Sequence, residues 1–233
     1  MQAVSHNDPA TSASTSCPPM SALPEDLPPA DTGPGVTAAQ RKRPRPGERR
    51  VQILQTLAGM LQEPGAERIT TAALAARLEV SEAALYRHFA SKAQMFEGLI
   101  EFIETSVFTL VNQITERETS GASQAQKIVQ VLLQFSEKNP GMVRVMVGDA
   151  LVFEHERLSA RMNQFFDRLE SQLRQSLRAA AEAAGSATPT VDAQALASAL
   201  TALAVGRLQR YARSGFKRLP TEHLEPALQR LTA

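Results

Sequence analysis

The side chains that point to a chemistry lie in one short stretch, residues 69–89, where hydroxyl, basic and aromatic groups alternate with apolar ones at helical spacing. Two apolar helix faces are separated by a turn at Glu79, and Ser81 is a favourable N-cap for the second helix. The small residues Ala75 and Ala76 permit the close, steep packing of a helix-turn-helix. The second helix then presents a polar, thin face made of Ser81, Glu82, Ala84, Arg87 and His88, with Tyr86 reaching sideways. Such a helix fits the major groove of DNA, and its hydroxyls and cations suit phosphates.

A basic segment leads directly into this stretch. The formal net charge is only +1, but residues 1–40 carry four acidic and no basic side chains, whereas residues 41–92 carry ten basic and five acidic ones. Six of the basic side chains fall between Arg41 and Arg50. A basic arm beside a helix-turn-helix is typical of nucleic-acid-binding proteins, which favours DNA binding over an ordinary helical hairpin with a solvated tail.

Side chains for catalysis or metal binding are sparse. Cys17 is the single cysteine, so neither a disulfide framework nor a zinc site made of cysteines can form. The Glu-His-Glu run at residues 154–156 is interpreted as a surface patch, because neighbouring side chains on a helix point apart. The sequence has no glycine-rich phosphate loop and no nucleophile elbow. We therefore expect no enzymatic activity, no cofactor and no metal.

The elements that must position the DNA-facing residues are helical. Residues 1–46 hold nine of the 14 prolines and no aromatic residue, so we expect a disordered tail with a basic arm. Beyond it, apolar spacing predicts helices over residues 51–61, 69–78, 81–89, 123–138, 158–177 and 191–213. A long helix should start at the capping box Ser91-x-x-Gln94, a short one should contain Leu151 and Phe153, and a last one should follow Pro220. Pro64-Gly65 and Asn139-Pro140-Gly141 are expected to end helices. No alternating run of β-branched residues occurs, so the fold is predicted to be all-α.

The string Ser81-Glu-Ala-Ala-Leu-Tyr-Arg-His-Phe89, followed by Ser91-Lys92 and a long helix, resembles the TetR family of DNA-binding proteins. Longer strings resemble the nucleoid occlusion factors of that family, among them Asn139-Pro-Gly141, Ala150-Leu-Val-Phe-Glu154 and residues 161–174. The resemblance implies a TetR-like fold, with a helix-turn-helix DNA-binding domain at residues 47–92 and a helical dimerisation and partner-binding domain at residues 93–233. It also implies a homodimer, cytoplasmic and associated with the nucleoid, that binds palindromic chromosomal sites and antagonises polymerisation of the division protein FtsZ.

The resemblance also assigns site residues. Those expected to contact DNA are Thr70, Thr71, Ser81, Ala83, Ala84, Tyr86, Arg87, His88 and Lys92. A groove between the long helix and the helix at residues 123–138 is expected to bind FtsZ through Phe102, Lys138 and Asn139. Three positions depart from the family pattern: Leu110 replaces a basic residue, Gln134 replaces a glycine, and Glu79 replaces a glycine in the turn. A left-handed Glu79 would carry about 1–2 kcal/mol of strain.

The large domain leaves two functions open. Dimerisation is expected through the last two helices, with the apolar residues Leu196, Leu200, Leu203 and Leu208 beside the small residues Ala199, Ala202 and Gly206. The alternative to a division inhibitor is a TetR-type transcriptional repressor that a small-molecule inducer releases. A sizeable internal cavity with a buried polar group would favour the repressor, and a filled core with an external groove would favour the division inhibitor.

Overall fold

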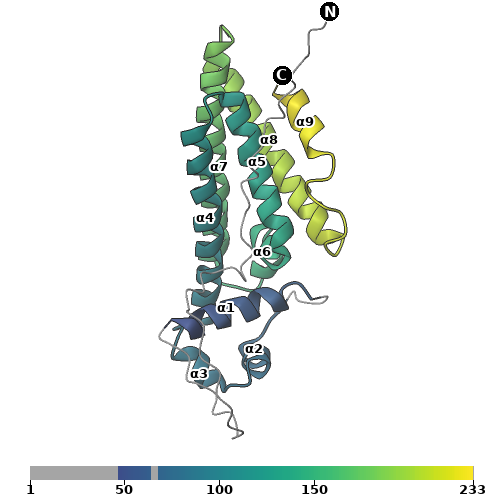
Figure 1. Cartoon of the computed structure of the whole chain (residues 1–233). Coiled ribbons are helices and arrows are strands. Elements are labelled where there is room, and N and C mark those ends of the chain that lie inside the picture. The colour runs from purple at the N-terminus through teal and green to yellow at the C-terminus, as the bar shows by residue number, and fades with distance from the viewer. Residues whose placement is uncertain (1–46, 64–67, 233) are drawn as a thin grey trace, which may run out of the picture.

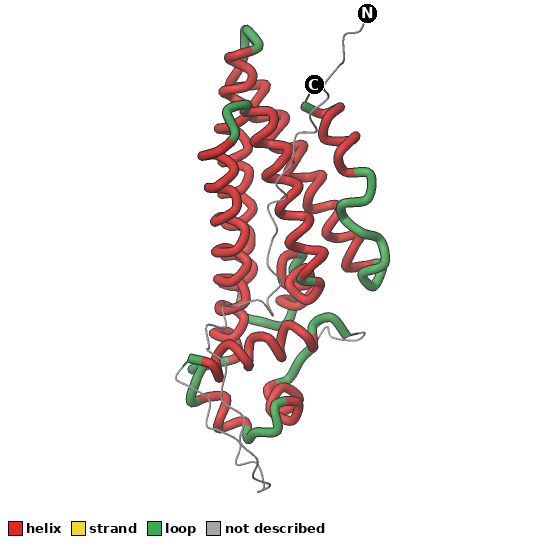
Figure 2. The backbone as a smooth tube through the Cα atoms, in the orientation of Figure 1, coloured by secondary structure: helices red, strands yellow, loops and turns green. Residues whose placement is uncertain are grey.

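The computed structural model describes residues 47–63 and 68–232, and within these ranges every regular element is helical, as the sequence predicts (Figures 1 and 2). The predicted tail at residues 1–46 and the helix stop at Pro64-Gly65 lie outside the described residues. The elements are α1 (Glu48–Met60), α2 (Thr71–Arg77), α3 (Glu82–Tyr86), α4 (Lys92–Arg117), α5 (Gly121–Lys138), α6 (Pro140–Met146), the 3-10 turn η2 (Asp149–Leu151), α7 (Glu156–Ala183), α8 (Pro189–Arg213) and α9 (Leu224–Leu231). Helices α1–α3 form a small unit at one end of the long helices α4, α5, α7 and α8 (Figure 1).

The long helices form a bundle because each has one continuous apolar face. Helix α7 packs against α8, α5 and α4, and α5 also packs against α4. Side chains at the centre of the bundle, such as Val107, Leu132 and Leu169, have no exposed surface. Amphipathic helices of this kind gain most of their stability from this burial. No helix within the described ranges is long and apolar enough to cross a membrane.

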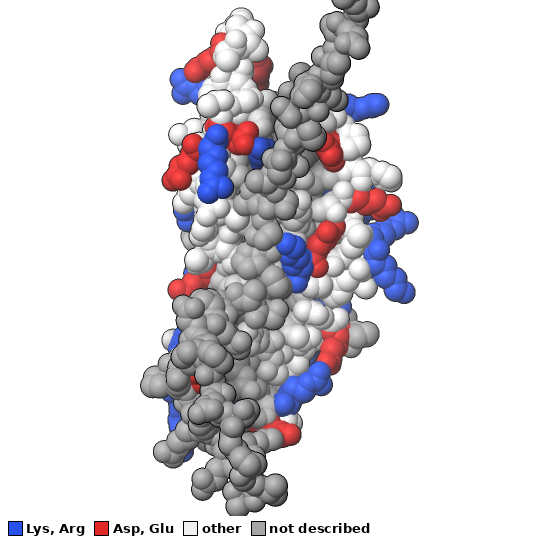
Figure 3. All heavy atoms as spheres, in the orientation of Figure 1, with Lys and Arg blue, Asp and Glu red and all other residues white. Residues whose placement is uncertain are grey.

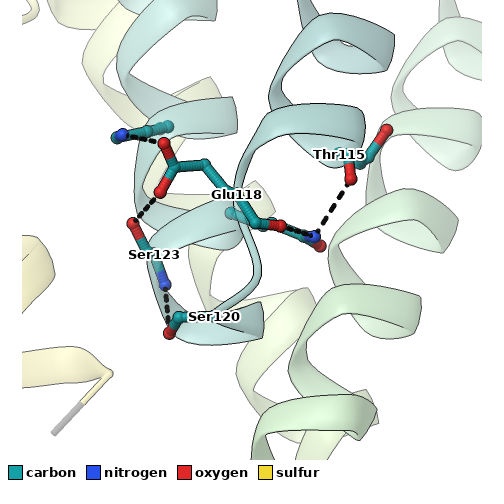
Figure 4. Close-up of polar contacts among 6 residues, drawn as sticks. Thr115, Glu118, Ser120 and Ser123 are labelled. Atoms are coloured by element: carbon teal, nitrogen blue, oxygen red, sulfur yellow. Dashed lines mark hydrogen bonds and ion pairs between the residues drawn. The ribbon is translucent and has the colours of Figure 1, made fainter.

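The turn between α4 and α5 is held by a polar network (Figure 4). Ser120 caps α5 by accepting a hydrogen bond from the Ser123 backbone N–H at 3.3 Å, and Ser123 Oγ donates to Glu118 Oε2 at 3.0 Å. Lys127 forms an ion pair with the same carboxylate. Hydrogen bonds from Lys127 and then Ser123 lower the pKa of Glu118. The network fixes the hairpin that forms the α4–α5 face.

The capping box at Ser91 forms with one change. Ser91 Oγ accepts from the Gln94 N–H at 3.2 Å, as predicted, but the Gln94 side chain accepts from the N–H of Ala90 at 2.6 Å rather than from that of Ser91. The start of α4 is thus fixed at the residue that follows the recognition unit.

The segment between α5 and α7 differs from the sequence-based prediction. Asn139 does end α5, but Pro140 begins a new helix, α6, because proline fits the first helical position, where no backbone N–H is needed. The predicted helix with Leu151 and Phe153 is wrong: Leu151 ends a 3-10 turn, and Phe153 follows it with 67% of its surface exposed.

Helix α6 supports α1 at very close range. An added Cβ on Gly141 would lie 2.1 Å from the carbonyl oxygen of Ala58 in α1. A separation this short is incompatible with a side chain, so glycine is required here. This contact joins the α1–α3 unit to the long-helix bundle.

Candidate nucleic-acid interface

The α2–α3 pair has the geometry of a helix-turn-helix. Leu74, Ala75 and Leu85 are buried between the helices, and Ser81 caps α3 by accepting from the Ala84 N–H at 3.3 Å. Glu79 in the turn has φ +55°, so the left-handed conformation considered from the sequence is present without glycine. The turn therefore stores about 1–2 kcal/mol of strain.

Two threonines link the starts of α2 and α3. Thr70 Oγ1 caps α2 by accepting from the Ala73 N–H at 3.1 Å, whereas Thr71 Oγ1 donates to Glu82 Oε2 at 2.6 Å. Thr71 can donate to a DNA phosphate only after it leaves Glu82. Sequence reasoning placed Glu82 on the outer face but missed this bond, which joins residues 11 positions apart.

The outer face of α3 is accessible. Tyr86 is 45% exposed, Ser81, Ala83, Arg87 and His88 are also exposed, and Ala84 is half-buried. Arg50, in α1, donates to the His88 carbonyl oxygen at 2.6 Å and lies 4.2 Å from the centre of the Phe89 ring. Part of the predicted basic arm therefore supports the end of α3, while Arg41, Lys42, Arg43 and Arg45 lie outside the described residues.

Lys92 lies at the junction between the recognition unit and the bundle. Its Nζ forms an ion pair with Glu154, in the segment between η2 and α7, and lies 5.7 Å from the centre of the Phe96 ring. Glu154 is a functional candidate that the sequence did not reveal. It is 62 residues from Lys92 in the chain, and the Glu-His-Glu run that contains it predicts only a surface patch. Its neighbour His155 instead caps α7, accepting at Nδ1 from the Arg157 N–H at 3.2 Å.

The predicted partner-binding residues lie around one buried ring, Phe135. Half-buried Phe102 lies 5.9 Å from Phe135, measured between ring centres, and Asn139 Nδ2 donates to the Phe135 carbonyl oxygen at 2.8 Å. Asn139 is only 4% exposed, while Lys138 beside it is exposed at the end of α5. Phe102 is thus partly accessible and Lys138 exposed, whereas Asn139 is buried and bonded to the end of α5.

The departures from the family pattern fall at two different depths. Leu110 is only 6% exposed and belongs to the core, whereas Gln134 is half-buried. A basic residue at position 110 would have to lie in this apolar environment.

The expected dimer face needs a correction. Leu200 and Leu208 are fully buried in the protomer's own core, because α8 turns this side toward α7, so they cannot face a second copy. Leu196 and Leu203 are half-buried, Ala199 and Ala202 are exposed, and an added Cβ on Gly206 would meet nothing within 4 Å. The accessible face of α8 therefore carries small and apolar side chains.

Comparison with known proteins agrees with this architecture. Residues 53–99 match the model for bacterial regulatory proteins of the tetR family, and residues 121–233 match the SlmA-like type of tetracyclin repressor-like C-terminal domain. A TetR family regulator from Thermus thermophilus, PfmR, superimposes with a TM-score of 0.64 at 19% identity, covering 78% of this chain and 95% of that chain. The regulator FadR from Bacillus subtilis superimposes with a TM-score of 0.62 at 12% identity, covering 78% and 97%. The fold and the α2–α3 unit define a TetR-type DNA-binding protein.

Sequence relatives narrow this class. The nucleoid occlusion factor SlmA of Idiomarina loihiensis is 50% identical over 191 residues, which are 82% of this chain and 95% of that protein. The SlmA of Photobacterium profundum is 51% identical over 186 residues, 79% of this chain and 94% of that protein. The chain belongs to the SlmA family of nucleoid occlusion factors.

Proposed function

We propose that this protein is a non-enzymatic nucleoid occlusion factor of the cytoplasm, which binds palindromic chromosomal DNA as a homodimer and, when bound, antagonises FtsZ polymerisation. The observation that carries the proposal is identity of 50% with a SlmA protein across 95% of its length. The helix-turn-helix geometry supports its DNA-binding part. We assign DNA binding to residues 47–92 and dimerisation and partner binding to residues 93–233.

DNA recognition follows from how α3 is presented. The exposed side chains of Ser81, Ala83 and Tyr86 lie on the short helix that would enter the major groove, where alanine methyl groups contact thymine methyls. Thr70 and Thr71 at the start of α2, with Arg87, His88 and Lys92, would contact the flanking phosphates.

Partner binding is assigned to the α4–α5 face. Phe102 is a half-buried aromatic side chain backed by a rigid ring, Phe135, so it can bury further area at little entropic cost. Lys138 supplies a cation for an acidic segment of FtsZ, and Asn139 holds the end of α5 in place.

Dimerisation is assigned to the open face of α8, where Ala199, Ala202 and Gly206 allow close approach of a second α8. Ala202→Glu would place one carboxylate from each copy in this contact. The variant should therefore be a monomer in sedimentation velocity at micromolar concentration. Asn112→Glu, on an exposed position of α4, is the matched control and should remain dimeric. A dimeric Ala202→Glu variant would place the interface elsewhere.

The test of the whole proposal is FtsZ sedimentation in the presence of GTP. A palindromic DNA selected from a random library by the protein itself is added with or without the protein, and a scrambled DNA is the control. We expect polymer mass to fall only when protein and selected DNA are both present. Unchanged FtsZ polymer, together with release from DNA by a small molecule, would establish the repressor function instead.

A further inference from the structure

A basic cavity lies at the corner where α8 leads into α9. It has a volume of about 560 Å³, and its walls carry the side chains of Arg207, Arg210, Lys217, Arg218 and His223, with Glu222 as the one carboxylate among its lining residues. Lys and Arg side chains gather at the right-hand edge of Figure 3, at the height of the α8–α9 loop in Figure 1. The cavity opens to solvent on the long-helix bundle, apart from the helix-turn-helix, and its lining is charged rather than apolar as an inducer cavity would be.

The cations of this corner are only partly balanced by Glu222, which lies 3.8 Å from His223 and whose charge opposes the lowering of the Arg207 pKa. Arg207 Nη1 donates to two neutral carbonyl oxygens, those of Pro220 at 2.9 Å and Glu222 at 2.7 Å. Burial, and then the charge of Arg210, lowers the pKa of Arg207. In the part of the chain that the structure describes, the side chains of Lys217 and Arg218 form no hydrogen bond or ion pair. The corner therefore presents a surplus of positive charge that an external anion can neutralise.

The corner adjoins the partner-binding end of α5. Thr221 in the α8–α9 loop donates from its backbone N–H to Glu137 Oε1 at 3.2 Å, and its hydroxyl donates to the same oxygen. Tyr211 of α8 also donates to the Glu137 carbonyl oxygen, at 3.5 Å. Lys138, the next residue, is exposed at the same end of α5. The end of α5 and the loop that carries Lys217 and Arg218 are therefore in direct contact through Glu137 and Thr221.

We infer that the α8–α9 corner binds an acidic peptide segment of the partner protein, as an extension of the site at Phe102 and Lys138. Carboxylates would pair with the cations of Lys217 and Arg218, and the exposed Leu219, 51% accessible at the rim, would pack against an apolar residue of the same segment. A nucleotide fits less well, since no aromatic side chain lines the cavity except the imidazole of His223. The inference rests on the proposed function in that it extends the same partner site.

Lys217 and Arg218 supply exposed cations near the end of α5, because the loop that carries them is bonded to Glu137 through Thr221. An acidic segment would then run from Phe102 past Lys138 to the corner.

The test uses the double variant Lys217→Gln/Arg218→Gln in the full chain. Both side chains are exposed and lie on a loop, so folding and DNA binding should be unchanged. The matched control is Arg117→Gln/Arg230→Gln, which removes two exposed cations, one at the end of α4 and one at the end of α9. In FtsZ sedimentation with selected DNA, the corner variant should need about three- to tenfold more protein for the same effect, and the control should match the wild type.

A second measurement keeps this inference separate from the proposed function. A fluorescein-labelled peptide of alternating Glu and Leu is titrated with each protein, with and without competing inorganic triphosphate. We expect the wild type and the control to bind the peptide and the corner variant to bind it about tenfold more weakly, with the difference shrinking as salt rises. Equal peptide binding by all three proteins would overturn the inference even if FtsZ is antagonised. Binding of triphosphate in preference to the peptide would overturn it as well, and would assign the corner to a phosphate ligand. Failure of the wild type to affect FtsZ, with peptide binding at the corner intact, would refute only the proposed function.

Discussion

Lys92, at the first turn of α4, forms an ion pair with Glu154, which lies between η2 and α7 and comes 62 residues later in the chain. A second contact joins the same two regions, because the Arg68 guanidinium lies 5.7 Å from the centre of the exposed Phe153 ring. The segment before α7 thus engages two cations of the DNA-binding unit. A DNA phosphate at Lys92 would compete with Glu154 for the same ammonium group, so we expect DNA binding to loosen this segment from Lys92.

Replacing Glu154 with glutamine should strengthen DNA binding. The substitution removes the carboxylate that competes with phosphate for Lys92, so the affinity should rise by about two- to tenfold at low salt, and the slope of log affinity against log salt should steepen by about 0.9 per half-site. Fluorescence anisotropy over a salt series measures both. Glu156→Gln, which removes an exposed carboxylate two residues away, should leave the slope unchanged. If the affinity and the slope of Glu154→Gln both equalled those of the wild type, removal of the carboxylate would give Lys92 no additional phosphate contact, and the competition between Glu154 and phosphate would be refuted.

The Gly141 contact with Ala58 predicts a large effect of a single methyl group. In Gly141→Ala the new Cβ would meet the Ala58 carbonyl oxygen at 2.1 Å, so α6 and α1 must move apart, at a cost of about 1–3 kcal/mol in the free energy of unfolding. Gly59→Ala is the control, because an added Cβ there meets nothing within 4 Å. This substitution should raise the free energy of unfolding by about 0.5–1 kcal/mol, since alanine favours the helix over glycine. Urea denaturation checks both. Equal stability of the two variants would show that α1 and α6 adjust freely.

Local patterns predicted most of the helices, and long-range geometry explains the failures. The caps at Ser81 and Ser91 and the left-handed Glu79 depend on a few neighbouring residues, so the sequence contains them. Pro140 was interpreted as a helix stop because a proline both ends one helix and begins another, and only the fold shows which occurs. The bond between Thr71 and Glu82 and the ion pair of Lys92 leave no periodic signal, because they join residues from different elements.

The predicted interface residues also needed a correction that only the three-dimensional packing supplies. Apolar spacing identified Leu200, Leu203 and Leu208 as one set, but it does not tell a core face from an interface face. The protomer's own packing decides this, since α7 already covers Leu200 and Leu208. Asn139 likewise had a predicted partner contact, and only 4% of its surface is exposed, since its side chain donates to the Phe135 carbonyl oxygen. Contact of each DNA- and partner-binding residue with its ligand stays a prediction.

The strained turn at Glu79 predicts a stabilising substitution. Glycine tolerates φ +55° without the Cβ strain of glutamate, so Glu79→Gly should raise the free energy of unfolding by up to about 1 kcal/mol, the relief of strain being partly offset by backbone entropy. Ala73→Gly, at an exposed position within α2, should instead lower it by about 1 kcal/mol. Thermal unfolding compares the two. A destabilised Glu79→Gly variant would show that contacts of the Glu79 side chain outweigh the backbone strain.

Phe102 gives the sharpest test of the partner site. Because its ring is half-buried against Phe135, Phe102→Ala should abolish FtsZ antagonism while DNA binding is kept, and it should cost less stability than the loss of a fully buried ring. Phe135→Ala provides that reference, with an expected loss of about 3–5 kcal/mol. Phe153→Ala removes an exposed ring outside the α4–α5 face and should leave FtsZ antagonism unchanged. The measurements are FtsZ sedimentation with selected DNA, anisotropy and urea denaturation. If Phe102→Ala lost as much stability as Phe135→Ala, or if it still antagonised FtsZ at wild-type concentrations, Phe102 would be a core residue and the partner would bind another surface.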